Sequence, residues 1–142
     1  RPPPPGVRIA EDLQESWLRS YQQYRPNKAD PAIVRMILDG NPPRAFADIA
    51  GQGPDDRSEL VAIARGHRNE GWLGLASIWT RPDHRQRGLA TAMMTALGNW
   101  AARQGARYAY LQVATVNEPA IAAYRSLGFI HHHAYRYLAP AR

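Results

Sequence analysis

A short basic loop is the part of this sequence whose residue types are best suited to bind a charged ligand. It consists of Arg85, Gln86, Arg87, Gly88, Leu89, Ala90 and Thr91. If a helix begins inside the loop, the backbone N–H groups of its first turn have no partner within the helix and lie at the positive end of the helix dipole. Gly88 then lets a phosphate approach these groups, and Arg85 and Arg87 add positive charge. The stretch predicts a phosphate-binding loop, although an ordinary strand–turn–helix connection also needs a glycine.

The segments on either side of the loop have the patterns of a strand and a helix. Residues 72–80 are apolar and rich in strand-forming residues, and Pro82 follows them. After the loop, apolar residues recur at the three- and four-residue spacing of one helix face. These positions are Leu89, Ala92, Met93, Ala96, Leu97, Trp100 and Ala101. Gly105, shortly after Arg103, favours the end of the helix. We therefore predict a strand, a tight basic loop and a helix that begins in the loop.

The loop and the end of the strand before it resemble a motif of the GNAT superfamily of acyl-CoA-dependent N-acetyltransferases. The residues that match its Arg/Gln-x-x-Gly-x-Gly/Ala pattern are Arg85, Gly88 and Ala90. The positions of its preceding hydrophobic-x-hydrophobic-x-Pro run are occupied by Ile78, Thr80 and Pro82. Thr80 stands in place of the usual valine.

A second motif of the same superfamily, Asn-x-x-Ala-x-x-x-Tyr-x-x-x-Gly-Phe, has a match further along the chain. The matching residues are Asn117, Ala120, Tyr124, Gly128 and Phe129. The two motifs occur in the order found in the family, and the resemblance spans roughly residues 60–137.

The resemblance implies an α/β (α+β) fold, with a central mixed, mostly antiparallel sheet flanked by helices. In this fold the sheet is split between the cofactor strand and the next strand. Acetyl-CoA is the implied cosubstrate, with no metal, and a small-molecule or peptide amine is the implied acceptor. The expected reaction is a direct attack of a primary amine on acetyl-CoA in a ternary complex.

The resemblance also implies which residues bind the cofactor and perform the chemistry. The cofactor-binding set is Ile78, Trp79, Thr80, Arg85, Gln86, Arg87, Gly88, Leu89, Ala90, Thr91, Asn117 and Tyr124. Backbone groups of Ile78 and Thr80 would polarise the thioester carbonyl, and Tyr124 would be the catalytic residue that gives a proton to the leaving thiolate. Trp79 either lines the acceptor pocket or packs in the core.

The general base is not apparent from the resemblance. Histone-type relatives carry a glutamate near the position of Gly74 or Leu75, and ribosomal-protein-type relatives carry one where this chain has Gln112. Both positions lack a carboxylate here. Either water relays the proton, or a residue outside the motifs accepts it. The candidates are Glu70, His67 and His131.

The composition fits one domain whose partner is an anionic cofactor. The chain has 142 residues, no cysteine and a formal net charge of +6. The lack of cysteine excludes disulfides and agrees with a reducing, cytoplasmic compartment. No run is long and apolar enough to be a membrane span or signal peptide. A positive charge of this size would also suit binding to nucleic acid. The tightest group of basic residues, however, is explained by the predicted phosphate loop, and it consists of Arg81, Arg85 and Arg87. We expect no nucleic-acid and no membrane partner.

The first six residues differ in composition from the rest of the chain. Residues 1–6 contain four consecutive prolines and have the character of a stiff, extended linker. We expect residues 7–142 to form the acetyltransferase domain. The domain is then either the C-terminal part of a longer polypeptide or a trimmed chain.

Periodicity and turn residues predict the remaining elements. Helices are expected after a capping Asp12 as far as Tyr24, from Asp30 to Gly40, and over residues 117–127. The remaining predicted strands are residues 7–10, 44–50, 59–67, 107–114 and 129–138. Because relatives have one more strand, the last family strand is expected to be missing. We expect a second subunit or an upstream domain to cover the edge that this leaves.

Two further patterns resemble sites but have a simpler interpretation. Residues 131–133 are three histidines, but neighbours on a strand point to opposite faces, so they cannot converge on one metal ion. Trp17 and Trp100 lie in apolar stripes and are expected in the core. Because the glutamates are missing, a non-catalytic acyl-CoA-binding sensor domain remains the alternative to an enzyme.

Overall fold

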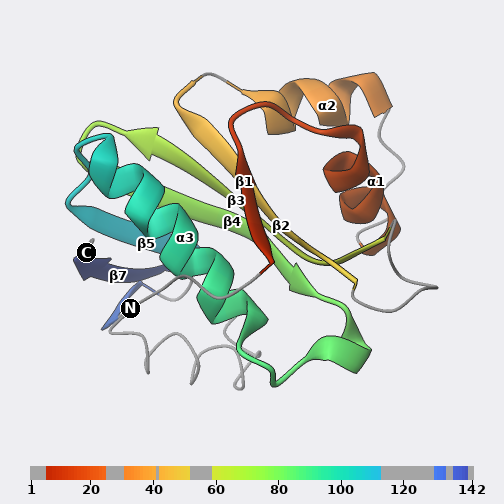
Figure 1. Cartoon of the computed structure of the whole chain (residues 1–142). Coiled ribbons are helices and arrows are strands. Elements are labelled where there is room, and N and C mark those ends of the chain that lie inside the picture. The colour runs from red at the N-terminus through yellow and green to blue at the C-terminus, as the bar shows by residue number, and fades with distance from the viewer. Residues whose placement is uncertain are drawn as a thin grey trace.

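The chain forms one sheet with helices on both faces (Figure 1). The structure, a computed structural model, describes residues 6–24, 31–40, 42–51, 59–112, 130–133 and 136–140. The helices are α1 (Glu15–Tyr24), α2 (Pro31–Asp39) and α3 (Leu89–Arg103), with a short 3₁₀ helix at Pro82–His84. The strands are β1 (Val7–Ala10), β2 (Arg44–Ala50), β3 (Leu60–Asn69), β4 (Trp72–Thr80), β5 (Tyr108–Gln112), β6 (Ile130–His133) and β7 (Arg136–Pro140). Their order in the sheet is β1-β2-β3-β4-β5-β7-β6.

Most of these elements agree with the sequence predictions. The bounds of β1, β2, β4 and α3 are those that periodicity and turn residues predict. One helix start is wrong: α1 begins at Glu15, and the carbonyl of Gln14 accepts the first helical hydrogen bond from Leu18. Asp12 therefore lies two residues too early to cap the helix.

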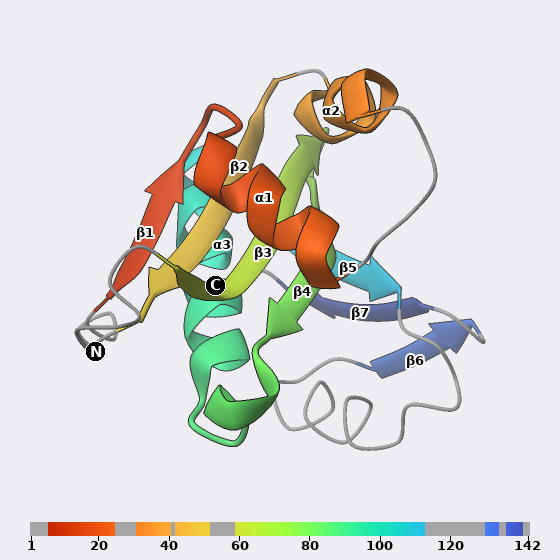
Figure 2. The same ribbon diagram turned by 90° about the vertical axis from the view of Figure 1, so that its right-hand side faces the viewer.

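The two faces of the sheet carry separate hydrophobic clusters. Helix α3 covers one face, and α1 and α2 cover the other (Figures 1 and 2). The division follows from strand alternation, because successive side chains point to opposite faces. On β2, for example, Ala45 and Ala47 pack on the α3 side, whereas Phe46 between them packs with the α1 and α2 cluster.

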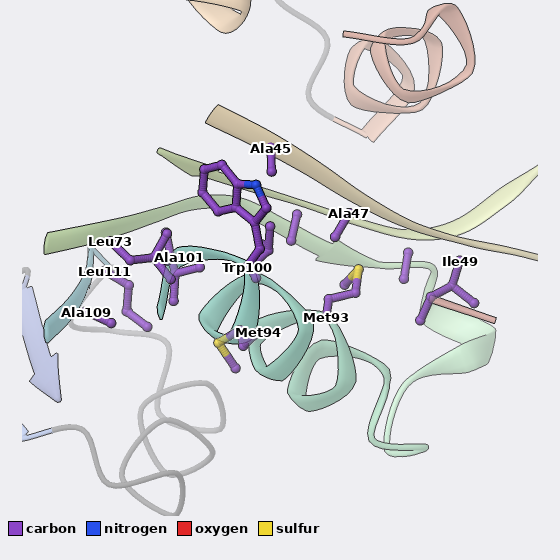
Figure 3. Packing of buried hydrophobic residues seen from close by; sticks show 14 of the residues in the cluster. Ala45, Ala47, Ile49, Leu73, Met93, Met94, Trp100, Ala101, Ala109 and Leu111 are labelled. Atoms are coloured by element: carbon purple, nitrogen blue, oxygen red, sulfur yellow. The ribbon is translucent and has the colours of Figure 1, made fainter. Parts of the chain in front are cut away.

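The two tryptophans predicted for the core are buried there. Trp100 of α3 points toward the sheet near Ala45 (Figure 3), and its Nε1–H donates to Glu11 at 3.2 Å. Trp17 of α1 is fully buried on the other face, where its Nε1–H donates to the carbonyl of Ala47 at 3.1 Å. Each indole thus satisfies its single donor while its ring fills the core.

The predicted split between β4 and β5 is present. These strands are parallel, and they pair from Trp72 with Tyr108 to Leu75 with Leu111. Beyond Leu75, Ala76, Trp79 and Thr80 of β4 still pair with β3, and no strand pairs with residues 76–80 on the other side among the described residues. All other neighbouring strands are antiparallel, so the sheet is mixed and mostly antiparallel as predicted.

The prediction of a missing last strand is wrong. The expected single strand over residues 129–138 is two strands, β6 and β7, which pair antiparallel with each other. Strand β7 also pairs with β5, from Tyr108 with Pro140 to Gln112 with Arg136. The run of aromatic and apolar residues contains no glycine, asparagine or proline to indicate a turn, so its pattern does not show where the strand is interrupted. The reason for expecting a partner to cover an incomplete sheet no longer holds.

Candidate active site

The half of β4 beside the split contains a β-bulge. Ile63 of β3 pairs with Trp79 and Arg65 pairs with Ala76, so β4 has one more residue than β3 between these pairs. Ser77 within the bulge has a left-handed backbone with φ of 55°. A bulged residue is left out of the ladder. At this place the backbone of β4 does not pair with β5, and its pairing with β3 is irregular. Backbone N–H and C=O groups of β4 can therefore form hydrogen bonds with a ligand here.

The basic loop ends at the N-terminus of α3, as predicted. Gly88 is the residue before the helix, with φ of 76°, and no side chain caps the helix end. A Cβ at Gly88 would meet no atom within 4 Å, so the space beside it is open. The first N–H groups of α3 therefore remain available to an anion. Gln86 also has a left-handed backbone, with φ of 64°, which is uncommon for a residue with a side chain.

The two arginines of the loop and Arg81 before it differ in their contacts. Arg81 donates to Asp83 at 2.7 Å and lies 3.5 Å from Glu59. Arg85 uses its Nε–H on the carbonyl of Thr80 at 3.0 Å. Arg87 is exposed and makes no hydrogen bond or ion pair with the described part of the chain. The charge available to an anionic ligand therefore comes from Arg85 and Arg87, whereas the charge of Arg81 is balanced within the protein.

Asp83 organises the start of the loop. Its carboxylate is also 2.8 Å from Nδ1 of His84. The hydrogen bonds from Arg81 and His84 lower the pKa of Asp83 to about 2. The carboxylate therefore stays charged at neutral pH and fixes the 3₁₀ turn that connects β4 to the loop.

Trp79 is stacked on a tyrosine of α1. Its ring and that of Tyr24 are nearly parallel, with centroids 4.9 Å apart. Tyr24 in turn contacts Tyr21, so aromatic rings connect the bulged half of β4 to α1. Ile78 packs against the opposite face, toward α3. Of the two sequence interpretations of Trp79, this geometry fits core packing, and the half-buried ring also borders the α1 side of β4.

A histidine and a tyrosine meet above Gly74, near the start of the split. Gly74 pairs with His67 of β3 on one side and with Tyr110 of β5 on the other. The Tyr110 hydroxyl is 3.2 Å from Nε2 of His67, across the glycine. Leu75 and Leu111 form the last β4–β5 pair, so this row of three residues lies one pair before the strands separate.

The surroundings of His67 favour a neutral imidazole. Burial lowers the pKa of His67, and the positive charge of Arg65 lowers it further. Nδ1 of His67 is buried and has no hydrogen-bond partner in the described part of the chain. A neutral imidazole at pH 7 can accept a proton, which a protonated one cannot do.

A shallow cavity of about 420 Å³ adjoins this pair. Its lining residues are Pro42, Arg65, His67, Arg68 and Asn69. None of them is acidic, and two carry guanidinium groups. Arg65 is held in place because its Nε–H donates to the carbonyl of Leu38 at 2.7 Å. The cavity is therefore suited to an anionic or hydrogen-bond-accepting group.

Two of the predicted site residues, Asn117 and Tyr124, lie outside the described residues, as does the predicted helix over residues 117–127. The other residues considered as bases lie in the described part of the chain. Gln112 is the last residue of β5, and His131 is in β6. Glu70 occupies the exposed turn between β3 and β4 with φ of 54°, away from the split. Among the candidate bases, His67 contacts another titratable side chain near the split, that of Tyr110.

Sequence reasoning missed Tyr110 and the bulge. Tyr110 had a usable signal, because alternation on β5 puts it on the same face as Tyr108 and Gln112. The bulge had no such signal in the sequence, since it depends on how β3 and β4 pair.

Within the described residues, no group of three or more histidine, aspartate or glutamate side chains could hold a metal ion. No helix in that part of the chain is long and apolar enough to cross a membrane.

Solved acetyltransferases share this architecture. The ribosomal-protein-S18-alanine N-acetyltransferase of Escherichia coli matches with a TM-score of 0.74 and 19% identity, over 95% of this chain and 94% of that chain. NAA60 of Arabidopsis thaliana, in complex with acetyl-CoA, matches with a TM-score of 0.73 and 14% identity, over 94% and 98% of the two chains. At these identities the likeness concerns the fold, which is the GNAT fold.

The sequence itself has acetyltransferase relatives. Streptothricin acetyltransferase of Streptomyces lavendulae is 30% identical over 111 residues, which cover 71% of this chain and 59% of that protein. The chain thus spans little more than half the length of this relative. The model of the family described as "Probable histone acetyltransferase Rv0428c C-terminal" matches residues 1–138. The chain belongs to this family of the GNAT superfamily, which confirms the resemblance found in the two motifs.

Proposed function

We propose that the protein is an N-acetyltransferase that transfers an acetyl group from acetyl-CoA to a primary amine. One structural observation carries the proposal. Strand β4 leads from its bulged half, which does not pair with β5, through the 3₁₀ turn and the basic loop to the N-terminus of α3, which no side chain caps. A thioester cofactor with a pyrophosphate needs both features, a partner for its carbonyl and a site for its phosphates. Here Gly88 follows Ile78 by ten positions, so both features belong to one continuous segment of the chain.

The cofactor would bind along this segment. The pyrophosphate is assigned to the loop, where Gly88 leaves open space and the N–H groups of Leu89, Ala90 and Thr91 begin α3. Arg85 and Arg87 precede this helix start by a few residues and would add positive charge for the phosphates, with the backbone of Gln86 between them. Asn117 remains part of the proposed cofactor set on the strength of its motif alone.

The thioester is assigned to the bulged part of β4. Backbone groups of Ile78 and Thr80, next to Trp79, would hydrogen-bond to its carbonyl oxygen. Because the β4–β5 pairing ends at Leu75, these groups have no competing partner on β5. A backbone N–H held in this way stabilises the negative charge that develops on the oxygen as the amine attacks. Tyr124 is proposed to protonate the leaving thiolate.

The relatives do not select the acceptor. Their names include an antibiotic, a ribosomal protein and histones, which cover small molecules and proteins alike. The cavity beside His67 does favour one chemical type, because its lining contains Arg65 and Arg68 and no acid. We expect an acceptor that carries an anionic or hydrogen-bond-accepting group near its amine, rather than a polycation.

The test is release of free CoA thiol from acetyl-CoA across a panel of amines. The panel should contain polyamines, aminoglycosides and peptide N-termini. A matched pair of dipeptides, alanyl-glutamate and alanyl-lysine, probes the charge of the cavity. We expect amine-dependent thiol release, with a higher kcat/KM for alanyl-glutamate.

Two results would contradict this proposal. CoA binding without thiol release for any amine would favour the sensor domain over an enzyme. A preference for alanyl-lysine would leave the enzyme in place but exclude the cavity as the binding site of the acceptor's charged group.

A further inference from the structure

The row formed by His67, Gly74 and Tyr110 joins three strands at the start of the split. The three residues are in register on β3, β4 and β5, so the outer two are separated by a whole strand. Strands lie about 4.8 Å apart, and two long side chains on the same face can therefore meet above a residue that has none. They do so here, with the Tyr110 hydroxyl 3.2 Å from Nε2 of His67.

The space above Gly74 is occupied by this pair. A Cβ at Gly74 would lie 2.4 Å from Cε1 of His67 and 2.7 Å from the Tyr110 oxygen. No side chain at position 74 could coexist with the two rings as they stand. The glycine is therefore a condition for the contact between His67 and Tyr110, and the functional groups above β4 at this point come from its two neighbours.

The charged groups around the pair keep the imidazole neutral. Arg65 lies two residues away on the same face of β3, and Arg44 of β2 is in register with His67. The carboxylate of Asp39, at the end of α2, forms an ion pair with Arg44 at 2.8 Å. The aromatic neighbour on β4 is Trp72, whose ring is 6.1 Å from that of Tyr110. Positive charge thus outweighs negative charge around the ring, and the pKa of His67 is lowered.

We propose that Tyr110, backed by His67, accepts the proton that the acceptor amine loses when it enters the split. The inference rests on the proposed N-acetyltransferase function and adds the base that both motifs lack. Tyr110 is the residue that faces the amine, and His67 is the positioning and proton-accepting residue behind it. Gly74 lies roughly 10 Å along β4 from the bulge, at about 3.3 Å per residue, so water bridges the distance that remains.

The proton and electron balance is complete with the groups named. The ammonium gives one proton to the bridging water, which passes a proton to the Tyr110 oxygen as the Tyr110 hydroxyl gives its own to Nε2 of His67, and His67 becomes an imidazolium. The amine nitrogen then attacks the carbonyl carbon, a C–N bond forms and the C–S bond breaks with its electron pair on sulfur. The nitrogen loses a second proton as the amide forms, and the thiolate gains one. His67 returns its proton to solvent.

The experiment compares three variants with the best amine from the panel. Tyr110→Phe removes one oxygen, and His67→Gln removes the imidazole. Tyr108→Phe is the matched control, since Tyr108 lies on the same strand as Tyr110 and contacts Trp72 rather than His67. We expect kcat to fall about a hundredfold or more in the first two variants, with KM for acetyl-CoA unchanged, and to stay near wild type in Tyr108→Phe.

Two further measurements distinguish a role of His67 and Tyr110 in proton transfer from a purely structural role. In the wild type kcat should fall with acidity as His67 becomes protonated, and in His67→Gln that limb should disappear. Added imidazole should restore part of the turnover of His67→Gly but not of Tyr110→Phe. If His67→Gln does not fold, Tyr110→Phe still tests the pair, since it keeps both rings.

Different outcomes would show that the protein is not an acetyltransferase and that Tyr110 and His67 are not its base. A wild-type protein that releases no thiol with any amine removes the enzymatic function and this assignment with it. An active wild type whose Tyr110→Phe and His67→Gln variants keep near-normal turnover and the same acid limb overturns the assignment alone.

Discussion

His67 and Tyr110 come from two strands that are not neighbours, and they meet within 3.2 Å above a glycine of the strand between them. The contact fills the space that a side chain on β4 would need. Gly74 itself has no side chain, so the titratable groups above the central strand at this point come from the two strands beside it.

A substitution at Gly74 tests how tightly this contact is built. Gly74→Ala should destabilise the protein by about 1–3 kcal/mol, because the new methyl group would overlap the His67 ring. Gly71→Ala is the matched control, since a Cβ at Gly71 meets nothing within 4 Å. Chemical denaturation of both variants measures the difference. Equal stability of the two would mean that the rings move apart at little cost.

The fold was largely predictable because its elements have strong local signals. Strand β4 is bounded by a turn at Gly71 and by Pro82, and α3 has a regular apolar face that ends before Gly105. The error over residues 129–138 arose where such signals are lacking. A run of histidines, tyrosines and apolar residues suits one strand or two equally well, and pairing with β5 determines which forms.

The site was predictable only where it is local in sequence. The loop from Arg85 to Gly88 forms a helix N-terminus, and a glycine at that point is visible in the sequence. The Ser77 bulge and the contact of His67 with Tyr110 depend on how β3, β4 and β5 pair. A single sequence does not contain that register, so these features required the structure.

The loop assignment predicts the effect of a charge at Gly88. Gly88→Glu should abolish CoA binding, because a carboxylate would occupy the open space at the helix N-terminus and repel the pyrophosphate. Isothermal titration calorimetry with CoA measures the affinity directly.

Gly105→Glu is the control for this variant. Gly105 also has a left-handed backbone, with φ of 92°, and open space around it, but it lies at the other end of α3. Both variants carry the same added charge and a similar backbone strain of about 1–2 kcal/mol. Undiminished CoA affinity in a folded Gly88→Glu protein would remove the phosphate site from this loop.

The motif around Tyr124 predicts a general acid. Tyr124→Phe should lower kcat about a hundredfold or more, because a phenol with an ordinary pKa near about 10 can protonate a departing thiolate. CoA affinity and melting temperature should change little, since only a hydroxyl is lost. Thiol-release kinetics check the first point and calorimetry the second. A variant with near-normal turnover would show that water protonates the thiolate and that Tyr124 only packs.

The environment of His67 predicts how stability depends on pH. Burial and Arg65 lower the pKa of His67 below its ordinary value of 6.5, and no acidic group lines the cavity beside it. Below pH 6.5 the unfolded chain therefore binds a proton at this position more readily than the folded protein does. The free energy of unfolding should rise with pH up to about 6.5, where this contribution becomes complete, and fall as the solution is acidified.

A histidine substitution isolates this contribution from that of the other titratable groups. In His67→Gln the loss of stability between pH 7.5 and pH 5 should be smaller than in the wild type, because glutamine takes up no proton. His84→Gln is the control, since His84 lies beside the carboxylate of Asp83 and not in a basic cavity. Urea denaturation at each pH gives the free energies. Parallel pH profiles for the wild type and His67→Gln would mean that His67 titrates alike in the folded and unfolded chains. The imidazole would then be mostly protonated below pH 6.5, where a neutral base is predicted.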